Sequence, residues 1–240
     1  ECHGLTFEDV KNAGSAAEFS PSELLTLGQQ DLERSLLYLG RNPVTKEQAS
    51  AVWKAIIKAY GDVSAIPDMV IQQLGWIAIG ISPQDISNIT LNEIDTIASL
   101  GKYHGLTLEQ LSALAEQVLN SWSSKEPEDY TCFDLVALQH ILCGFNRSAI
   151  DKIHPAAYSE ASNTLGNLKN CPMDIMRGLA KLATSSAAFG SVESWTPVQV
   201  NAIGCVLSGL EPSSIASIPP RSLEYLAPET AQCIPPQLIK

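Results

Sequence analysis

The chain has 240 residues, of which 45% are apolar and only 17% are charged, so it can bury a core and does not belong to the disordered class. Its formal net charge is −11 at pH 7 and it contains no run of basic residues, which argues against a nucleic-acid partner. No apolar run reaches the roughly 18 residues of a membrane helix, so no transmembrane segment is expected. The acidic residues form no D-x-D-x-D-G loop, and neither a metal nor a cofactor is expected.

The predicted elements are helices along the whole chain. Two long amphipathic segments, Thr45–Tyr60 and Leu106–Asn120, carry apolar residues at helical spacing. Convincing period-2 alternation is absent, so little or no sheet is expected. Six helix starts share a Ser or Thr followed within three residues by an acid or amide, which caps the free N–H groups of the first turn. These starts are Thr6, Ser20, Thr45, Ser82, Thr107 and Thr196.

An apolar pattern behind a glycine recurs three times. Gly80, Gly144 and Gly209 lie 64 and 65 residues apart, and each is followed by an isoleucine six and nine residues later. The helix starts at Ser20 and Ser82 extend the period at a spacing of 62 residues. A fixed period of this length is typical of helical repeats that bury their apolar faces on one another.

We therefore predict one continuous helical-repeat segment over residues 1–240, with repeats at about 18–79, 80–143, 144–208 and a partial one at 209–240. The stretch Ser121–Asp129 is predicted to be a loop between repeats. The recurring glycines are expected to end helices in the left-handed conformation, which glycine adopts at no steric cost.

Four of the six cysteines form two pairs with the same spacing. Cys143 and Cys171 are 28 residues apart, and so are Cys205 and Cys233. Relative to the repeat glycines, the second pair has moved jointly by three residues, as two bonded partners would. We predict the disulfides Cys143–Cys171 and Cys205–Cys233, as suits a secreted protein; the alternative is four buried, reduced thiols.

The other two cysteines, Cys2 and Cys132, lie two repeats apart. In an extended stack that separation exceeds the roughly 7 Å that a disulfide allows between Cα atoms, so a direct bond is not expected. A partner of Cys2 would lie upstream of the chain. The chain opens on Glu-Cys without Met or signal peptide, so we expect a mature product or part of a longer protein.

No catalytic constellation emerges, and we expect no enzyme. The sequence lacks H-E-x-x-H, C-x-x-C, G-x-S-x-G and a glycine-rich phosphate loop. The histidines are isolated from one another: His3, His104, His140 and His154. Two sequons predict N-glycosylation at Asn88 and Asn146, both in short capped helices. Trp122, in the predicted loop, is the candidate for an exposed ligand-binding side chain that could stack on a sugar.

Three neighbouring segments resemble the mesothelin, stereocilin and otoancorin superfamily. Val70–Trp76 reads V-I-Q-Q-L-G-W, and it leads into Ile81–Ile86, I-S-P-Q-D-I, and then a sequon within Asn88–Ile94. Mesothelin-type sequences likewise run from V-I-Q-x-L-G-aromatic through S-P-E-D-I to a sequon. The pair Cys143 and Cys171 also resembles a cysteine pair of that family. The resemblance is strongest over residues 60–145.

This resemblance implies an all-α, right-handed superhelical stack, an armadillo-like α-solenoid of short helices. It also implies a secreted or cell-surface glycoprotein with a role in adhesion or in attachment to extracellular gels. The leading hypothesis is a non-enzymatic extracellular segment that binds a protein or glycoprotein, mucin-like or part of a gel matrix, through one face of the repeat. Any membrane anchor would lie elsewhere in the parent protein. The alternatives are a structural spacer within a larger matrix or filament protein and a carbohydrate-binding module.

Overall fold

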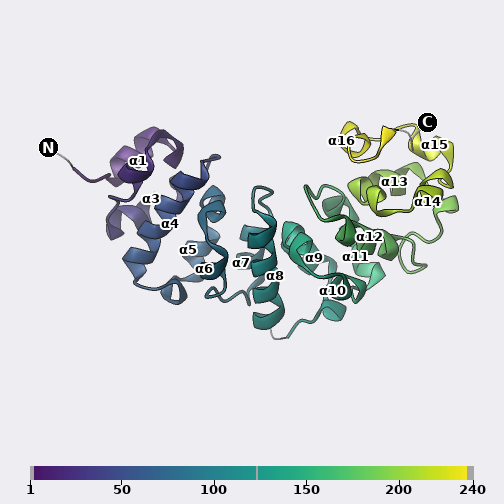
Figure 1. The fold of residues 1–240 in the computed structure, drawn as a ribbon, viewed down its shortest axis with the longest axis horizontal. Coiled ribbons are helices and arrows are strands. Elements are labelled where there is room, and N and C mark those ends of the chain that lie inside the picture. Colours follow the sequence, from purple (N-terminus) through teal and green to yellow (C-terminus); the bar gives the residue numbers. More distant parts are fainter. Residues whose placement is uncertain (1–2, 123, 237–240) are drawn as a thin grey trace. The chain divides into compact units, whose positions relative to one another are not determined.

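The protein is described by a computed structural model over residues 3–122 and 124–236, and these residues form helices and turns but no strand (Figure 1). Two compact units make up the chain: an N-terminal unit that ends at Trp122 and a C-terminal unit that begins at Ser123. The boundary falls within Ser121–Asp129, the stretch predicted as a loop. The all-α fold class is confirmed for the described residues.

The N-terminal unit consists of α-helices with short 3-10 helices (η) between some of them. In chain order these are α1 (Phe7–Ala13), η1 (Ala16–Glu18), α2 (Pro21–Leu24), α3 (Gln29–Leu39), α4 (Lys46–Tyr60), η2 (Val63–Ala65), α5 (Asp68–Gln72), η3 (Gly75–Gly80), α6 (Pro83–Ile86), α7 (Ile94–Gly101) and α8 (Leu108–Ser121). Within this unit α4 packs on α2 and η3, α5 on α7, and α6 on α8.

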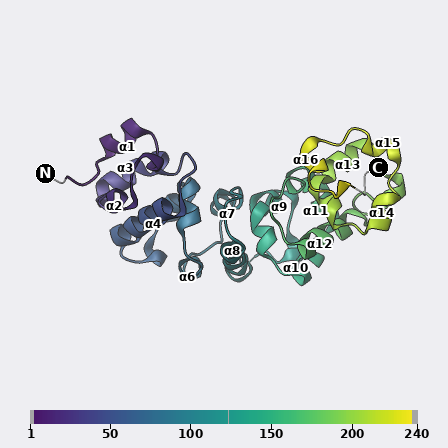
Figure 2. The ribbon, with the colours of Figure 1, turned by 45° about the horizontal axis from the view of Figure 1, so that its top comes forward.

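The C-terminal unit follows the same order of elements. These are η4 (Pro127–Asp129), α9 (Cys132–Leu138), η5 (Gln139–Gly144), α10 (Arg147–Asp151), α11 (Pro155–Leu165), α12 (Met173–Ala183), η6 (Val192–Ser194), α13 (Pro197–Ile203), η7 (Gly204–Gly209), α14 (Pro212–Ala216), α15 (Pro220–Leu223) and α16 (Pro228–Ala231). Helix α11 packs on α9, α12 and α13 (Figure 2). The 3-10 helices were not anticipated from the sequence, nor were α5 and α9, the helices before η3 and η5; α13, before η7, was predicted by its start at Thr196.

The predicted helix starts are confirmed as N-caps. Five of them form complete capping boxes: Thr6, Ser20, Thr45, Thr107 and Thr196. In each box the N-cap hydroxyl accepts a hydrogen bond from the backbone N–H of residue N3, and the side chain of N3 accepts one from the backbone N–H of the N-cap. Ser82 caps α6 through the N–H of Asp85, but the Asp85 carboxylate instead accepts from the indole Nε1 of Trp53 at 2.9 Å. This bond joins the short helix α6 to the long helix α4.

The recurring glycines end the three six-residue 3-10 helices η3, η5 and η7, but the expectation that they adopt the left-handed conformation is wrong. Positive φ occurs instead five residues earlier, at the first residue of each 3-10 helix: Gly75, Gln139 and Gly204, with φ of 55°, 40° and 55°. In two of the three repeats, the residue after this position donates its N–H to a glycine carbonyl, Trp76 to Gly40 and Cys205 to Gly166.

Two of the repeat glycines, Gly80 and Gly209, are instead required by close packing between backbones. A Cβ added to Gly80 would overlap the backbone of Ala49 and Ser50 in α4. A Cβ added to Gly209 would overlap the backbone of Met176 in α12 in the same way. Each glycine therefore lets a 3-10 helix rest directly on the preceding long helix, a contact that any larger residue would force apart.

Candidate interaction surface

The two predicted cysteine pairs are joined in the structure, and both lie within the C-terminal unit. The Cα atoms of Cys143 and Cys171 are 4.9 Å apart, and those of Cys205 and Cys233 are 5.4 Å apart. Both separations fall in the range of ordinary disulfides. Each bond ties a six-residue 3-10 helix to the segment beside a later helix. Cys132 is a free, half-buried thiol, and Cys2 lies outside the described residues.

In the N-terminal unit, glutamines make the equivalent connection by hydrogen bonds. The Nε2 of Gln110, which is 3% exposed, donates to the carbonyls of Ile79 and Ile81 at 2.9 and 2.8 Å. Gln48 lies 62 residues earlier and donates in the same way to Ala17 and Phe19 at 3.0 and 2.9 Å. Each glutamine thus holds the end of a 3-10 helix at the start of the long helix that follows.

Both sequons are accessible to solvent. Asn88 is exposed just after α6, where its side-chain amide donates to the carbonyl of Gln84 at 3.4 Å. Asn146 is the exposed N-cap of α10, and its Oδ1 accepts from the N–H of Ala149 at 2.8 Å and from the Ser148 hydroxyl at 2.7 Å. A glycan is attached to Nδ2, so this cap is compatible with modification. Glycosylation at both sites stays a prediction.

The expectation that Trp122 offers an exposed aromatic face is wrong. The residue follows α8 directly, its N–H donates to the carbonyl of Val118 at 3.0 Å, and only 7% of it is exposed. Helix α8 includes Ser121, the first residue of the predicted loop, and Trp122 is its C-cap, so the indole joins the core. A sugar that stacks on an aromatic ring needs an accessible face, and Trp122 does not present one.

A series of large, exposed apolar side chains occupies one recurring position. Met69 on α5, Phe133 on α9 and Val198 on α13 are 66%, 74% and 78% exposed. Each is the second residue of its helix and lies 11 residues before a repeat glycine. Counting backward from the glycines, as well as forward, would have revealed this series in the sequence.

A neighbouring position one repeat earlier, the first residue of α1, shows how such a side chain can be covered. Phe7 lies 62 residues before Met69 and is half-buried rather than exposed. The guanidinium of Arg34 lies over its ring, 4.1 Å from the centroid, and the ring of Tyr38 meets it edge-on at 6.1 Å. Here the chain itself supplies a cation and an aromatic group to an apolar side chain at the start of a short helix.

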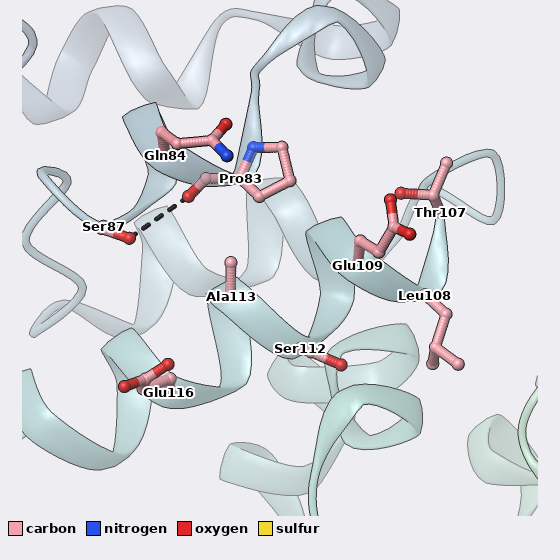
Figure 3. A pocket seen from close by; sticks show the side chains of 9 residues that line it. All are labelled: Pro83, Gln84, Ser87, Thr107, Leu108, Glu109, Ser112, Ala113 and Glu116. Atoms are coloured by element: carbon pink, nitrogen blue, oxygen red, sulfur yellow. Dashed lines mark hydrogen bonds between the residues drawn. The ribbon is translucent and has the colours of Figure 1, made fainter.

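Two open grooves in the N-terminal unit also recur at equivalent places. One, of about 450 Å³, lies between α2 and α4, and the other, of about 770 Å³, lies between α6 and α8 (Figure 3). Every lining residue of the first groove has a counterpart 62 positions later in the second, beginning with Pro21 and Pro83. Their charges differ: Lys54 in the first groove corresponds to Glu116 in the second.

Among the described residues, no cluster of three or more His, Cys, Asp or Glu side chains could hold a metal ion. None of the helices over residues 3–122 and 124–236 is long and apolar enough to cross a membrane. The features that the geometry brings together are therefore surface features: a recurring exposed apolar position and a recurring groove.

Comparison with known proteins gives relatives along nearly the whole chain, although no protein-family model matches it. The chain is 25% identical to otoancorin of Mus musculus over 244 residues, which cover 100% of the chain and 21% of otoancorin. It is 26% identical to stereocilin of Mus musculus over 229 residues, 95% of the chain and 12% of stereocilin. For stereocilin of Homo sapiens the identity is 24% over 230 residues. The chain thus spans about a fifth or less of the length of these relatives.

Proposed function

We propose that this homologue of otoancorin and stereocilin is a non-enzymatic attachment segment of an extracellular protein. It would bind a glycoprotein or matrix partner, mucin-like or gel-forming, through one face of a right-handed α-solenoid. The observation that carries this proposal is the recurring exposed apolar position at Met69, Phe133 and Val198. Contiguous exposed apolar surface marks a site that a partner covers, and the recurrence of these three side chains at one position of the repeat supports such a surface.

The order of helices supports a repeat as the frame for this face. Each of the three positions belongs to a short helix that precedes a six-residue 3-10 helix and its terminal glycine. In one continuous solenoid of residues 1–240, with a period of 62–65 residues, equivalent positions would form a row at regular intervals. A broad row of modest contacts suits attachment to an extended partner better than a single pocket does.

The disulfides support a place outside the cell. Structural disulfides persist in oxidising compartments, and both bonds here join ordered helices within one compact unit. The two exposed sequons suit the same location. We therefore propose that the parent protein is secreted or held at the cell surface.

The proposal is tested by measuring how the secreted, disulfide-bonded chain is retained on a mucin-type glycoprotein and on a reconstituted extracellular-matrix gel. The variant Met69→Gln/Phe133→Gln/Val198→Gln removes the apolar row. The matched control, Leu37→Gln/Tyr225→Gln, changes side chains that are also exposed, 65% and 76%, but lie outside the row. We expect the row variant to lose retention about tenfold or more and the control to keep it, because apolar anchors carry most binding energy.

Equal retention of the row variant and the parent chain would refute the proposal. Retention of neither partner, together with concentration-dependent association of the chain with its own copies, would favour a structural spacer instead. Circular dichroism of each variant shows that the helices are intact before retention is compared.

A further inference from the structure

The groove between α6 and α8 is open and carries charge of one sign. The charged groups among its lining residues are the carboxylates of Glu109 and Glu116, which project from α8 on either side of Ala113 (Figure 3). Pro83 and Ser87 of the short helix form the opposite wall. Both carboxylates are exposed to solvent and lie seven residues apart on one helix face, about 10 Å along the axis.

The counterpart of this groove between α10 and α12 is occupied by an arginine of the chain itself. Arg147 lies three residues after its repeat glycine, as Pro83 does, and it begins α10. Its Nη1 bonds to the Asp174 carboxylate at 3.0 Å, and its Nε bonds to Asp151 at 2.9 Å. The hydrogen bond to the Asp151 carboxylate, and next the one to Asp174, raise the pKa of Arg147, so the guanidinium keeps its positive charge.

The α12 side of this arrangement matches the open groove, whereas the second acceptor, Asp151, corresponds to Ser87. The close approach of Gly80 to Ala49 and of Gly209 to Met176 aligns α4 with α12, and the capping threonines align α4 with α8. In this alignment Asp174 corresponds to Glu109 and Gly178 corresponds to Ala113. A Cβ added to Gly178 would lie 3.0 Å from Cδ of Arg147, so the arginine stem rests on this glycine.

We propose that the α6/α8 groove binds an arginine-bearing segment of a partner protein, in the place that Arg147 fills between α10 and α12. The carboxylate is present, the small residue beneath it is present, and proline at position 83 leaves the space unfilled. Arginine suits the groove because its planar guanidinium pairs with carboxylates through two donors while its stem packs on apolar surface.

The distance between the two carboxylates specifies the segment further. A chain in the polyproline II conformation advances about 3.1 Å per residue with three residues per turn, so arginines three positions apart point to the same side and lie about 9 Å apart, close to the roughly 10 Å between Glu109 and Glu116. An Arg-x-x-Arg segment thus places one guanidinium on each carboxylate. This inference goes beyond the proposed function, because the groove involves α6 and α8 and not the apolar row on α5, α9 and α13.

The test is fluorescence anisotropy with a labelled Arg-x-x-Arg peptide in a Gly/Ser background and the whole disulfide-bonded chain. Glu109→Gln/Glu116→Gln is expected to weaken binding about tenfold or more, since hydrogen bonds to charged groups contribute on that scale. The control Glu47→Gln removes the counterpart of Glu109 from the α2/α4 groove, where two lysines line the walls, and should leave affinity within about twofold. A peptide with Gln in place of Arg should not bind.

A second variant tests occupancy without removing any acid. Pro83→Arg places an arginine where Arg147 stands in the equivalent groove, and its side chain should fill the site and abolish peptide binding. The proposal is overturned if Glu109→Gln/Glu116→Gln binds as tightly as the parent chain, or if Glu47→Gln weakens binding equally. The Met69→Gln/Phe133→Gln/Val198→Gln variant should keep peptide affinity, so failure here is distinct from failure of the attachment proposal.

Discussion

Gly80 and Gly209 should tolerate no side chain, even the single methyl group of alanine. A Cβ on Gly80 would lie 2.7 Å from the carbonyl oxygen of Ala49 and closer still to two further backbone atoms of α4. Ordinary van der Waals contact begins at 3.4 Å, so η3 would have to move away from α4. The atoms in the way belong to the backbone of a 15-residue helix, which cannot rotate aside as a side chain can.

The cost follows from the nature of this clash. Overpacking of a core costs about 1–3 kcal/mol, and a backbone-to-backbone clash belongs at the upper end of that range. Alanine also lowers the conformational entropy of the unfolded chain, which stabilises the folded state by about 0.4–1 kcal/mol where alanine can adopt the native φ and ψ. Neither glycine has a positive φ, so this gain applies. Gly80→Ala and Gly209→Ala should therefore each lower the free energy of unfolding by about 2 kcal/mol.

The assay is urea unfolding followed by far-UV circular dichroism, with the change in free energy taken from the shift in midpoint at constant slope. Gly28→Ala is the matched control, because φ at Gly28 is −80° and a Cβ there would meet no atom within 4 Å. Because Gly28 is the N-cap of α3, where alanine is less favourable than glycine, the control should cost no more than about 1 kcal/mol. If Gly80→Ala or Gly209→Ala proves as stable as Gly28→Ala, the repeat glycines are not explained by backbone contact.

Further predictions concern single sites in each unit. Gln139→Gly should raise stability by about 1 kcal/mol. The backbone strain of a non-glycine residue at φ 40° exceeds the entropy that a more flexible glycine loses on folding, and a lower urea midpoint would contradict this. Gln110→Ala should cost about 2 kcal/mol in the same assay, since two carbonyls lose their donor, whereas the exposed Gln84→Ala should be nearly neutral. Tyr158→Phe should stabilise by about 1 kcal/mol, because the tyrosine hydroxyl is fully buried with no hydrogen-bond partner among the described residues, and burial also raises its pKa and keeps it protonated. Replacing either cysteine pair by serine should lower the free energy of unfolding by about 3.5 kcal/mol, by the same amount for both because each pair spans 28 residues. Before these variants are made, peptide mapping without reduction should recover the bonds Cys143–Cys171 and Cys205–Cys233 in the parent chain.

Local signals in the sequence predicted the helices well where a single short stretch decides the structure. The caps at Thr45 and Thr107 and the apolar spacing behind them located α4 and α8 to within a residue or two, since a capping box is formed by four neighbouring residues. The exposure of Trp122 was predicted wrongly because its neighbours in the sequence are polar. Its burial depends instead on where the apolar side of α8 meets the core.

The role of the glycines could not be predicted from their spacing. A left-handed conformation and close backbone packing both favour glycine. Only the contact of Gly80 with a helix about 30 residues earlier distinguishes these two explanations, and that contact is not visible in the sequence. The true left-handed position was hidden because the middle repeat places Gln139 there instead of glycine. The exposure of Met69 and its counterparts was missed for a different reason: exposure is a property of packing, and a sequence pattern of apolar residues first predicts a core.

The Cys143–Cys171 bond replaces a hydrogen-bonded connection rather than adding to one. Cys143 lies 64 residues after Ile79, whose carbonyl Gln110 holds, and the counterpart of Gln110 on α12 is Ile175. Ile175 is as deeply buried as Gln110, at 3% exposure, but an aliphatic side chain has no donor for a carbonyl. The covalent bond therefore ties the 3-10 helix to the start of α12 where the polar connection is chemically impossible. Reduction of the disulfides should therefore leave the glutamine-held 3-10 helices of the N-terminal unit in place. In the C-terminal unit alone, reduction of Cys143–Cys171 should loosen η5 from α12.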